Sequence, residues 1–441
     1  MVRDEEMADE RRVSTSLVER ARLPDGISQR TLTAVVSVAL ILQGMAVAVY
    51  LVVVSNVQPI DFQAFYFAAE RALEGEPFVG RSPPPEVQAT WPPGASSSWV
   101  FPPVVVLYFV PFTLLPASLA WLAQDVLNVV FVALTAGVLL GLRGQTDWNR
   151  ASRLAFAALL CNPYSVVDLA QGQLNSLVLL LLVGGVVLVA SHRETLGGVA
   201  LGLAAVVKIW PVGVGLWLLW RRDWRAIAAA TVTGVSGLLG GVLLFGTPTT
   251  RQWLSVVLVE RSQMARLVGR ISADNDMTTL ARPLSVLFPN LDALVALGIA
   301  ALVVLAGVGY VFRRATPDER PMATAGLTLG ATLLVVPAAR YPYLLVPLST
   351  GLGLLYRGEP SGRSRWLLAA GAVVCATPMN LADFAAIAPP GLVGFPADVL
   401  LKALPPYLLG GVLLVVAHGL LATSGSDAIR GSDVAVGNAE K

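Results

Sequence analysis

The sequence predicts an all-α protein that crosses a membrane many times as a bundle of helices, and two observations carry this prediction. Hydrophobic residues make up 55% of the 441 residues and charged residues only 14%, which is far outside the range of soluble globular domains. Several apolar stretches approach or exceed the roughly 20 residues that span about 30 Å of hydrocarbon as a helix, whereas the ~10-residue alternating strands of an outer-membrane barrel are absent. The net charge of +2 and the scattered basic residues indicate no nucleic-acid partner.

The apolar pattern predicts about twelve helices that cross the bilayer. They are expected at 31–54, 117–142, 152–168, 174–190, 195–210, 211–220, 226–245, 291–312, 321–337, 342–356, 366–379 and 405–422. The two helices on either side of Pro211 are short, because proline breaks or kinks a helix. We expect one transmembrane domain over 31–422, preceded by a cytoplasmic segment over 1–30 and followed by a disordered cytoplasmic tail over 423–441.

The arginines predict which side of the membrane each loop faces. Cytoplasmic loops carry an excess of basic residues, and on this helix assignment the basic segments all fall on one side. They are the segment before the first helix and the loops that hold Arg143 to Arg153, Arg221 to Arg225, Arg313 to Arg320 and Arg357 to Arg365. The opposite side carries long segments at 55–116, 246–290 and 380–404. The working surface is therefore expected outside the plasma membrane, with both termini in the cytoplasm.

The first external segment contains an isolated acid, Asp61, in the stretch "NVQPIDFQAFYFAAERALEGEPF". The helical spacing of Phe62, Phe65 and Ala69 predicts an amphipathic helix over 62–73 that lies in the membrane interface. The proline-bounded stretch "FPPVVVLYFVPFTLLP" is too short for a safe crossing and is expected to form a second interfacial helix. At the start of the first of these helices, Asp61 would simply cap the helix dipole.

Polar residues inside the predicted membrane segments gather toward the outer helix ends. Ionisable residues there are costly and are functional candidates. The group consists of Gln124, Asp125, Asn128, Asp168, Gln171, Gln173, Asn175 and Lys208, which are expected to face one outer-leaflet cavity. Structural alternatives remain open for each: hydrogen bonds between helices for Asp125 and Asn128, turn formation for Gln171 and Asn175, and snorkelling to the interface for Lys208. A phosphate contact is the functional alternative for Lys208.

External arginines form a second set of candidates. They are Arg261, Arg266, Arg270, Arg282 and Arg340. The guanidinium group suits bidentate phosphate recognition, while contact with anionic lipid headgroups is the alternative. Asp274 and Asp276 could hold a divalent cation, but two acids without a third ligand are a weak signal, so we expect no metal and no cofactor.

Five stretches together resemble glycosyltransferase family 87 of the polytopic GT-C superfamily, in order and in spacing. They read "DFQAFYFAAERALEGEPF", "FPPVVVLYFVPFTLLP", "LAQGQLNSLVLLLLV", "GGVALGLAAVVKIWPVGVGLWLLWRRDWRA" and "NDMTTLARPL", and the resemblance covers most of residues 55 to 350. It implies a GT-C type bundle that transfers a sugar, on the outer face, from a polyprenyl-phosphate donor to a glycolipid or glycan acceptor. Because the family contains both mannosyltransferases and an arabinofuranosyltransferase, the donor sugar stays open between mannose, which we favour, and a pentofuranose.

The resemblance also implies roles for single residues. The catalytic acid of the family falls on Asp61, and its helix-interrupting lysine falls on Lys208. Its glutamine and asparagine pair matches Gln173 and Asn175, and its asparagine with a downstream arginine matches Asn275 and Arg282. The chain departs from the family where relatives often show His-Tyr, because Pro342-Tyr343 stands there with Arg340 nearby.

Sugar transfer places defined demands on these residues. A carboxylate within about 2.6–3.2 Å of the acceptor hydroxyl acts as general base, a role that suits Asp61. The negative charge on the leaving phosphate would be stabilised by Lys208, Arg270, Arg282 or Arg340. Asp168, Gln173, Asn175, Asn275 and Tyr343 complete the expected substrate-binding set. A lipid-linked-substrate transporter or flippase is the main alternative, since it would also place polar residues in a membrane cavity.

Overall fold

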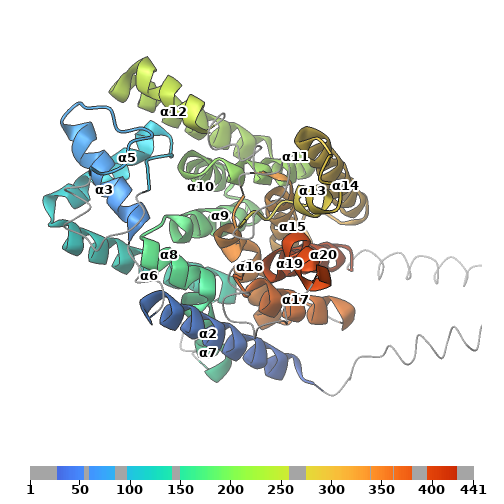
Figure 1. Cartoon of the computed structure of the whole chain (residues 1–441). Coiled ribbons are helices and arrows are strands. Elements are labelled where there is room, and N and C mark those ends of the chain that lie inside the picture. The colour runs from blue at the N-terminus through green and yellow to red at the C-terminus, as the bar shows by residue number, and fades with distance from the viewer. Residues whose placement is uncertain are drawn as a thin grey trace, which may run out of the picture.

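The computed structural model describes residues 27–53, 59–84, 97–141, 149–257, 275–337, 339–360, 362–379 and 395–424. Within these ranges every regular element is a helix, and β-pairing is limited to two isolated bridges. Figure 1 shows the helices gathered into one bundle. The prediction of an all-α helical bundle is therefore confirmed for the residues that the structure describes.

The helices follow the predicted order along the chain. They are α2 (Gln29–Val53), α3 (Ile60–Leu73), η1 (Pro103–Val105), α5 (Val106–Phe109), η2 (Val110–Leu114), α6 (Ala117–Leu140), α7 (Arg150–Cys161), α8 (Pro163–Gln171), α9 (Asn175–Ala190), α10 (Glu194–Val207), η3 (Trp210–Val214), α11 (Gly215–Arg221), α12 (Trp224–Ser255), α13 (Ala281–Leu287), α14 (Ala293–Arg314), α15 (Pro321–Val335), η6 (Tyr341–Leu344), α16 (Leu345–Arg357), α17 (Gly362–Cys375), α19 (Phe395–Ala403) and α20 (Pro406–Thr423). Each predicted crossing helix thus has a helical counterpart.

Five of these helices are long and apolar enough to cross a membrane by themselves, namely α2, α6, α12, α14 and α20. The pair α7 and α8 would make a sixth span, bent by 46° at its break. Other helices such as α9, α10 and α15 have only 14 to 16 residues, which is short of the roughly 20 that span the hydrocarbon core. The number of about twelve crossings therefore stays a prediction.

Local sequence explains the break between α7 and α8. The Asn162 side chain accepts hydrogen bonds from the backbone N–H groups of Tyr164 and Ser165, and Pro163 occupies the first position of α8. Both features start a new helix. Helix α2 crosses this break so closely that a Cβ atom on Gly44 would lie 1.6 Å from the Cys161 carbonyl oxygen. Only glycine fits there, and α2 is thereby held against the bent pair.

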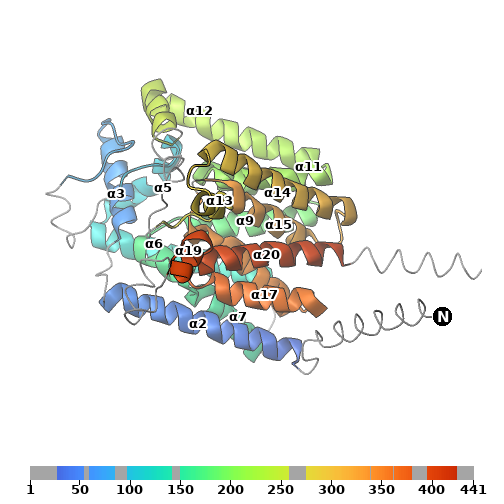
Figure 2. The same ribbon diagram turned by 45° about the vertical axis from the view of Figure 1, so that its right-hand side comes forward.

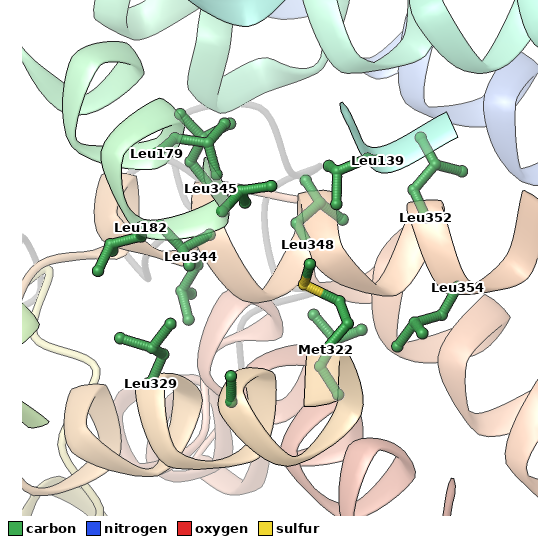
Figure 3. Packing of buried hydrophobic residues seen from close by; sticks show 14 of the residues in the cluster. Leu139, Leu179, Leu182, Met322, Leu329, Leu344, Leu345, Leu348, Leu352 and Leu354 are labelled. Carbon is green, nitrogen blue, oxygen red and sulfur yellow. The ribbon is translucent and has the colours of Figure 1, made fainter. Parts of the chain in front are cut away.

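The main core lies around α16, whose residues Leu345 to Leu355 are all buried. Figure 3 shows Leu345 of α16 beside Leu179 of α9, and Leu348 of α16 toward Leu139 of α6. In contrast, α12 and α14 expose many large apolar side chains. In a membrane protein these exposed faces are the surfaces that contact lipid.

A second cluster, made largely of aromatic residues, joins α3 to the segment 99–112. Phe65 of α3 contacts the rings of Trp99, Phe101 and Phe109 at centroid distances of 4.9 to 5.9 Å. The prediction of a helix over 62–73 is confirmed by α3. The prediction of one helix over 101–116 is wrong in detail, because the prolines of this stretch divide it into η1, α5 and η2.

The described parts of the predicted basic loops lie at one end of the bundle. Arg357 at the end of α16 donates to the Leu139 carbonyl near the end of α6, and Gln29 at the start of α2 donates to the Leu355 carbonyl. Arg320 before α15 donates to the Leu421 carbonyl near the end of α20. Figure 2 shows this end, where α2 starts and α20 stops, opposite the end that carries α3 and α5. Which end faces the cytoplasm stays a prediction.

Candidate active site

A cavity of about 780 Å³ lies at the end of the bundle that carries α3. Its polar part is lined by Asp61, Gln173, Lys208, Arg340 and Tyr343, which come from four separate stretches of the chain. The remainder is mostly apolar and runs between η3, α11, α14 and α15. The cavity therefore combines one charged end with a long hydrocarbon-like wall.

Asp61 lies in the first turn of α3, but it does not cap the helix. The N-cap is Pro59, and no side chain accepts a capping hydrogen bond there. The Asp61 carboxylate instead accepts a hydrogen bond from the Gln173 side-chain amide. A carboxylate in the first helical turn still interacts favourably with the helix dipole.

Lys208 lies where α10 ends, and its side chain turns into the protein. Its backbone is extended, and η3 with Pro211 begins two residues later. The ammonium donates to Asn175 Oδ1 at 2.5 Å and to Gln173 Oε1 at 3.4 Å, and it lies 4.5 Å from the centroid of the Tyr343 ring. With 6% of the residue exposed, Lys208 does not snorkel to the interface.

Gln173 links the base candidate to the cation. Its amide nitrogen donates to Asp61, and its amide oxygen accepts from Lys208. Its backbone carbonyl is held from α6 by the side chains of Asn128 at 3.0 Å and Gln124 at 3.4 Å. These two polar residues of α6 therefore act as interhelical hydrogen-bond donors that fix the turn between α8 and α9.

Asp168 is completely buried beneath the same turn and does not line the cavity. Its carboxylate accepts from the backbone N–H groups of Asn175 and Ser176, at 3.1 and 2.9 Å, and from the Ser176 hydroxyl. These amides belong to the first turn of α9, whose N–H groups lack partners within the helix. We expected Asp168 to bind substrate, but both of its carboxylate oxygens already accept hydrogen bonds from the protein.

Gly172 brings the turn against α3. Its φ is +62°, and a Cβ atom there would lie 2.6 Å from Phe62 Cβ.

We predict that Gly172→Ala lowers the stability of the protein by about 1–3 kcal/mol through overpacking. The backbone strain of an alanine at this φ adds to that loss. Thermal unfolding of the detergent-purified protein measures this loss. Gly184→Ala in α9 is the matched control, because a Cβ atom there meets nothing within 4 Å, and an equal loss in both variants would contradict the prediction.

Arg340 supplies the second cation of the cavity. Its Nε donates to Asp276 Oδ2 at 2.5 Å, and its side chain remains 52% exposed while that of Asp276 is 9% exposed. Burial lowers the pKa of Arg340, but the charge and hydrogen bond of Asp276, together with the nearby Tyr343 and Asp61, outweigh burial and raise the pKa above its usual value. The guanidinium is therefore held in its charged form beside the cavity.

Asn275 and Arg282 are buried outside the cavity lining. Arg282 donates to the carbonyl oxygens of Asn275 and Lys402 and to the Tyr407 hydroxyl. Its Nε and Nη1 atoms are therefore occupied by protein acceptors, while Nη2 is buried without a partner among the described residues, and Arg282 does not line the cavity where a phosphate would bind. Arg261, Arg266, Arg270 and Asp274 lie outside the residues that the structure describes.

Two neighbours of the cations were not expected from the sequence. Trp210 stacks on Tyr343 with the ring centroids 5.7 Å apart, and Phe101 lies 5.6 Å from the Lys208 ammonium. Aromatic faces attract cations. The tryptophan two residues after the lysine in "VKIWP" is the feature of the sequence that indicates one of them.

Comparison with known proteins places these residues in context. The model of glycosyltransferase family 87 matches residues 99–337, more than half of the chain. The polyprenol-phosphate-mannose-dependent alpha-(1-2)-phosphatidylinositol mannoside mannosyltransferase of Mycobacterium tuberculosis is 27% identical over 306 residues, which cover 66% of this chain and 66% of that protein. No solved structure gives a significant match. The family match includes Gln173, Asn175 and Lys208, whereas Asp61 precedes it and Arg340 follows it.

Proposed function

The chain belongs to glycosyltransferase family 87, and from this premise we propose that it transfers mannose from a polyprenyl-phosphate donor to a glycolipid acceptor. The name of the mycobacterial relative contains a polyprenol-phosphate-mannose donor and a phosphatidylinositol mannoside acceptor. We propose the same donor class here, and an acceptor of the same chemical kind, a mannoside carried on a lipid.

One observation carries the proposal: a carboxylate and two cations share the polar end of a cavity that is otherwise apolar. A donor of this class has the same division, because a charged phosphate and a sugar are joined to a long hydrocarbon. Lys208 and Arg340 carry positive charges that complement the negative charge of the phosphate. Asp61, which is bonded to Gln173, is the acid on the same polar lining.

The proposed reaction is a direct displacement at the anomeric carbon. The Asp61 carboxylate takes the proton from the acceptor hydroxyl while the hydroxyl oxygen forms the new glycosidic bond. The bond from the anomeric carbon to the phosphate oxygen breaks, and the polyprenyl phosphate leaves with the electron pair. Lys208 and Arg340 stabilise the charge on that oxygen, and they do so more strongly in a partly dry cavity than in water.

The apolar part of the cavity would receive the first part of the prenyl chain. It is lined by Val212 and Leu216 on one side, Leu305 on α14, and Ala331 and Val335 on α15. Val212, Leu216 and Leu305 are themselves exposed, so this part of the cavity is open toward the surface that contacts lipid. The tail would therefore enter sideways from the bilayer, between α11 and α14.

The assay that tests this function follows radiolabelled sugar from a polyprenyl-phosphate donor in membranes that contain the protein. We expect a labelled glycolipid that forms only when the protein is present, and formation with a mannosyl donor but not with an arabinofuranosyl donor. Movement of the lipid-linked donor across the bilayer without a new glycosidic bond would instead support a transporter or flippase. Transfer that is equal in membranes without the protein would overturn the proposal.

We also propose that the cavity opens on the outer face, because the arginine-rich helix ends lie at the opposite end of the bundle. The prediction is that a membrane-impermeant maleimide labels Glu74→Cys, at the end of α3, in intact cells. Glu319→Cys, before α15, should be labelled only after the cells are permeabilised. Wild-type protein, with Cys161 and Cys375, measures background labelling, and the reverse pattern would contradict this orientation.

A further inference from the structure

The stretch that begins at Asn275 is paired with the stretch around Arg340. Met277 and Arg340 form an isolated antiparallel bridge. The Thr278 N–H donates to the Ala339 carbonyl at 3.0 Å, and the Tyr341 N–H donates to the Asp276 carbonyl at 3.1 Å. The backbone on both sides of Arg340 is therefore held by the segment that carries Asp276.

The side chain of Arg340 is held by the same segment. Asp276 Oδ2 occupies the Nε atom of Arg340, which leaves the two terminal nitrogens of the guanidinium for other acceptors. Asp276 is almost completely buried and Arg340 is half-exposed. The Asp276 carboxylate is therefore the fixed partner, and the Arg340 guanidinium is the group exposed to the cavity. The ion pair thus aims a charged fork at the cavity that Arg340 lines.

Arg282 fixes the turn around Asp276 from the other side. Its Nη1 donates to the Asn275 carbonyl at 2.8 Å and to the Tyr407 hydroxyl at 2.6 Å, and lies 3.4 Å from the Met277 carbonyl. Its Nε donates to the Lys402 carbonyl at 2.5 Å. One fully buried guanidinium therefore ties the residues before and after Asp276 to α19 and α20.

A buried cation is costly unless its hydrogen-bonding groups are satisfied. The acceptors of Arg282 are carbonyl oxygens, the Asn275 amide oxygen and a phenol, all on Nε or Nη1. Among the residues that the structure describes, Nη2 has no partner and Arg282 forms no ion pair. The main structural effect of Arg282 is to fix the position of the turn that carries Asp276. A hydrophobic side chain would fill the same space without fixing that turn.

We propose that Asp276 and Arg282 are positioning residues that act on the donor phosphate through Arg340. Neither lines the cavity. Arg282 holds the turn, the turn holds Asp276, and Asp276 orients the guanidinium of Arg340. The inference rests on the proposed function, because it takes the ligand of Arg340 to be the phosphate of a prenyl-phosphate donor.

The test uses the full-length protein in detergent, farnesyl phosphate as the probe, and the variants Asp276→Asn and Arg282→Lys. Asp276→Asn keeps the shape and an acceptor for Arg340, but it removes the charge that orients the guanidinium. We expect both variants to bind farnesyl phosphate about 10- to 100-fold more weakly, as for a lost charge-assisted hydrogen bond. Their KM for the donor should rise, while their KM for the acceptor stays unchanged.

Arg221→Lys is the matched control. Arg221 is also a buried arginine, which donates to the Pro317 carbonyl at 2.5 Å and pairs with Asp223, but it does not line the cavity. It should bind farnesyl phosphate as the wild type does. In an Arg340→Ala background, Asp276→Asn and Arg282→Lys should cause no further loss, because their effect passes through Arg340.

Three outcomes would overturn the inference. If the wild type binds farnesyl phosphate and both variants bind it equally well, the inference is overturned but the proposed function is not. Losses that add fully to that of Arg340→Ala show that the two residues act elsewhere. A wild-type protein that neither binds farnesyl phosphate nor transfers sugar overturns the proposed function and this inference together. If Arg282→Lys unfolds, Asp276→Asn still decides between these outcomes.

Discussion

Asp61→Asn is expected to reduce sugar transfer by about 10²- to 10⁴-fold, the range that a general base contributes, while the fold and donor binding are retained. An asparagine has the same shape and can still accept the hydrogen bond from the Gln173 amide. It cannot accept a proton from a sugar hydroxyl. The loss should therefore appear in kcat, with the KM for the donor nearly unchanged.

The measurement is transfer of radiolabelled mannose in membranes with equal amounts of each protein. Glu70→Gln is the matched control, since it neutralises another acid of α3 that does not line the cavity. It should retain the wild-type rate. Near-normal turnover by Asp61→Asn would remove Asp61 from the role of base, whatever the remaining variants do.

Lys208→Met is expected to lower kcat/KM for the donor by about 10²- to 10³-fold, which is the effect of removing one group that stabilises the developing charge. Methionine retains much of the apolar stem of lysine but offers no ammonium to the phosphate. It also removes the hydrogen bonds to Asn175 and Gln173. Binding of farnesyl phosphate should weaken, which distinguishes this variant from Asp61→Asn.

Arg193→Met is the control for Lys208→Met. The two basic residues flank the same helix, α10, but Arg193 lies at its exposed other end. Kinetics at varied donor concentration should show no change for Arg193→Met. An unchanged dependence on donor in Lys208→Met would show that the buried ammonium serves only the packing around Tyr343.

The sequence predicted much of the helical framework because apolar length and prolines are local signals. The predicted end of one helix at residue 245 coincides with the break in α12 at Gly246, where φ is +80°. The break expected at Pro211 appears between α10 and η3. The sequence does not separate α5 from η1 and η2, because closely spaced prolines in an apolar stretch do not indicate which turns remain α-helical.

The polar centre was predictable in part. Asp61, Gln173, Asn175 and Lys208 come together in the structure, because each lies at or next to the end of a helix. Of these, Asn175 does not line the cavity, and the outer location of the cavity stays a prediction. The resemblance supplied their suggested roles, which stay predictions. Position at a common helix end is a local property, and so the sequence could indicate it.

The arginines were harder to assign for a physical reason. A guanidinium suits a phosphate and a backbone carbonyl equally well, so residue type could not tell that Arg282 bonds to carbonyls while Arg340 faces the cavity. The ion pair of Arg340 with Asp276 spans 64 positions in sequence. Only tertiary packing determines such a pairing, and a local pattern does not contain it.

The amide of Gln173 has a consequence for how the energetics of this protein are interpreted. One planar group donates to the acid and accepts from the ammonium, so neither can be altered without changing the other's surroundings. Free-energy losses measured for Asp61 and Lys208 separately are then not independent contributions, and their sum should exceed the loss of the double variant. In the proposed reaction, proton removal and phosphate release would then be energetically coupled through Gln173, a residue that is neither acid nor base.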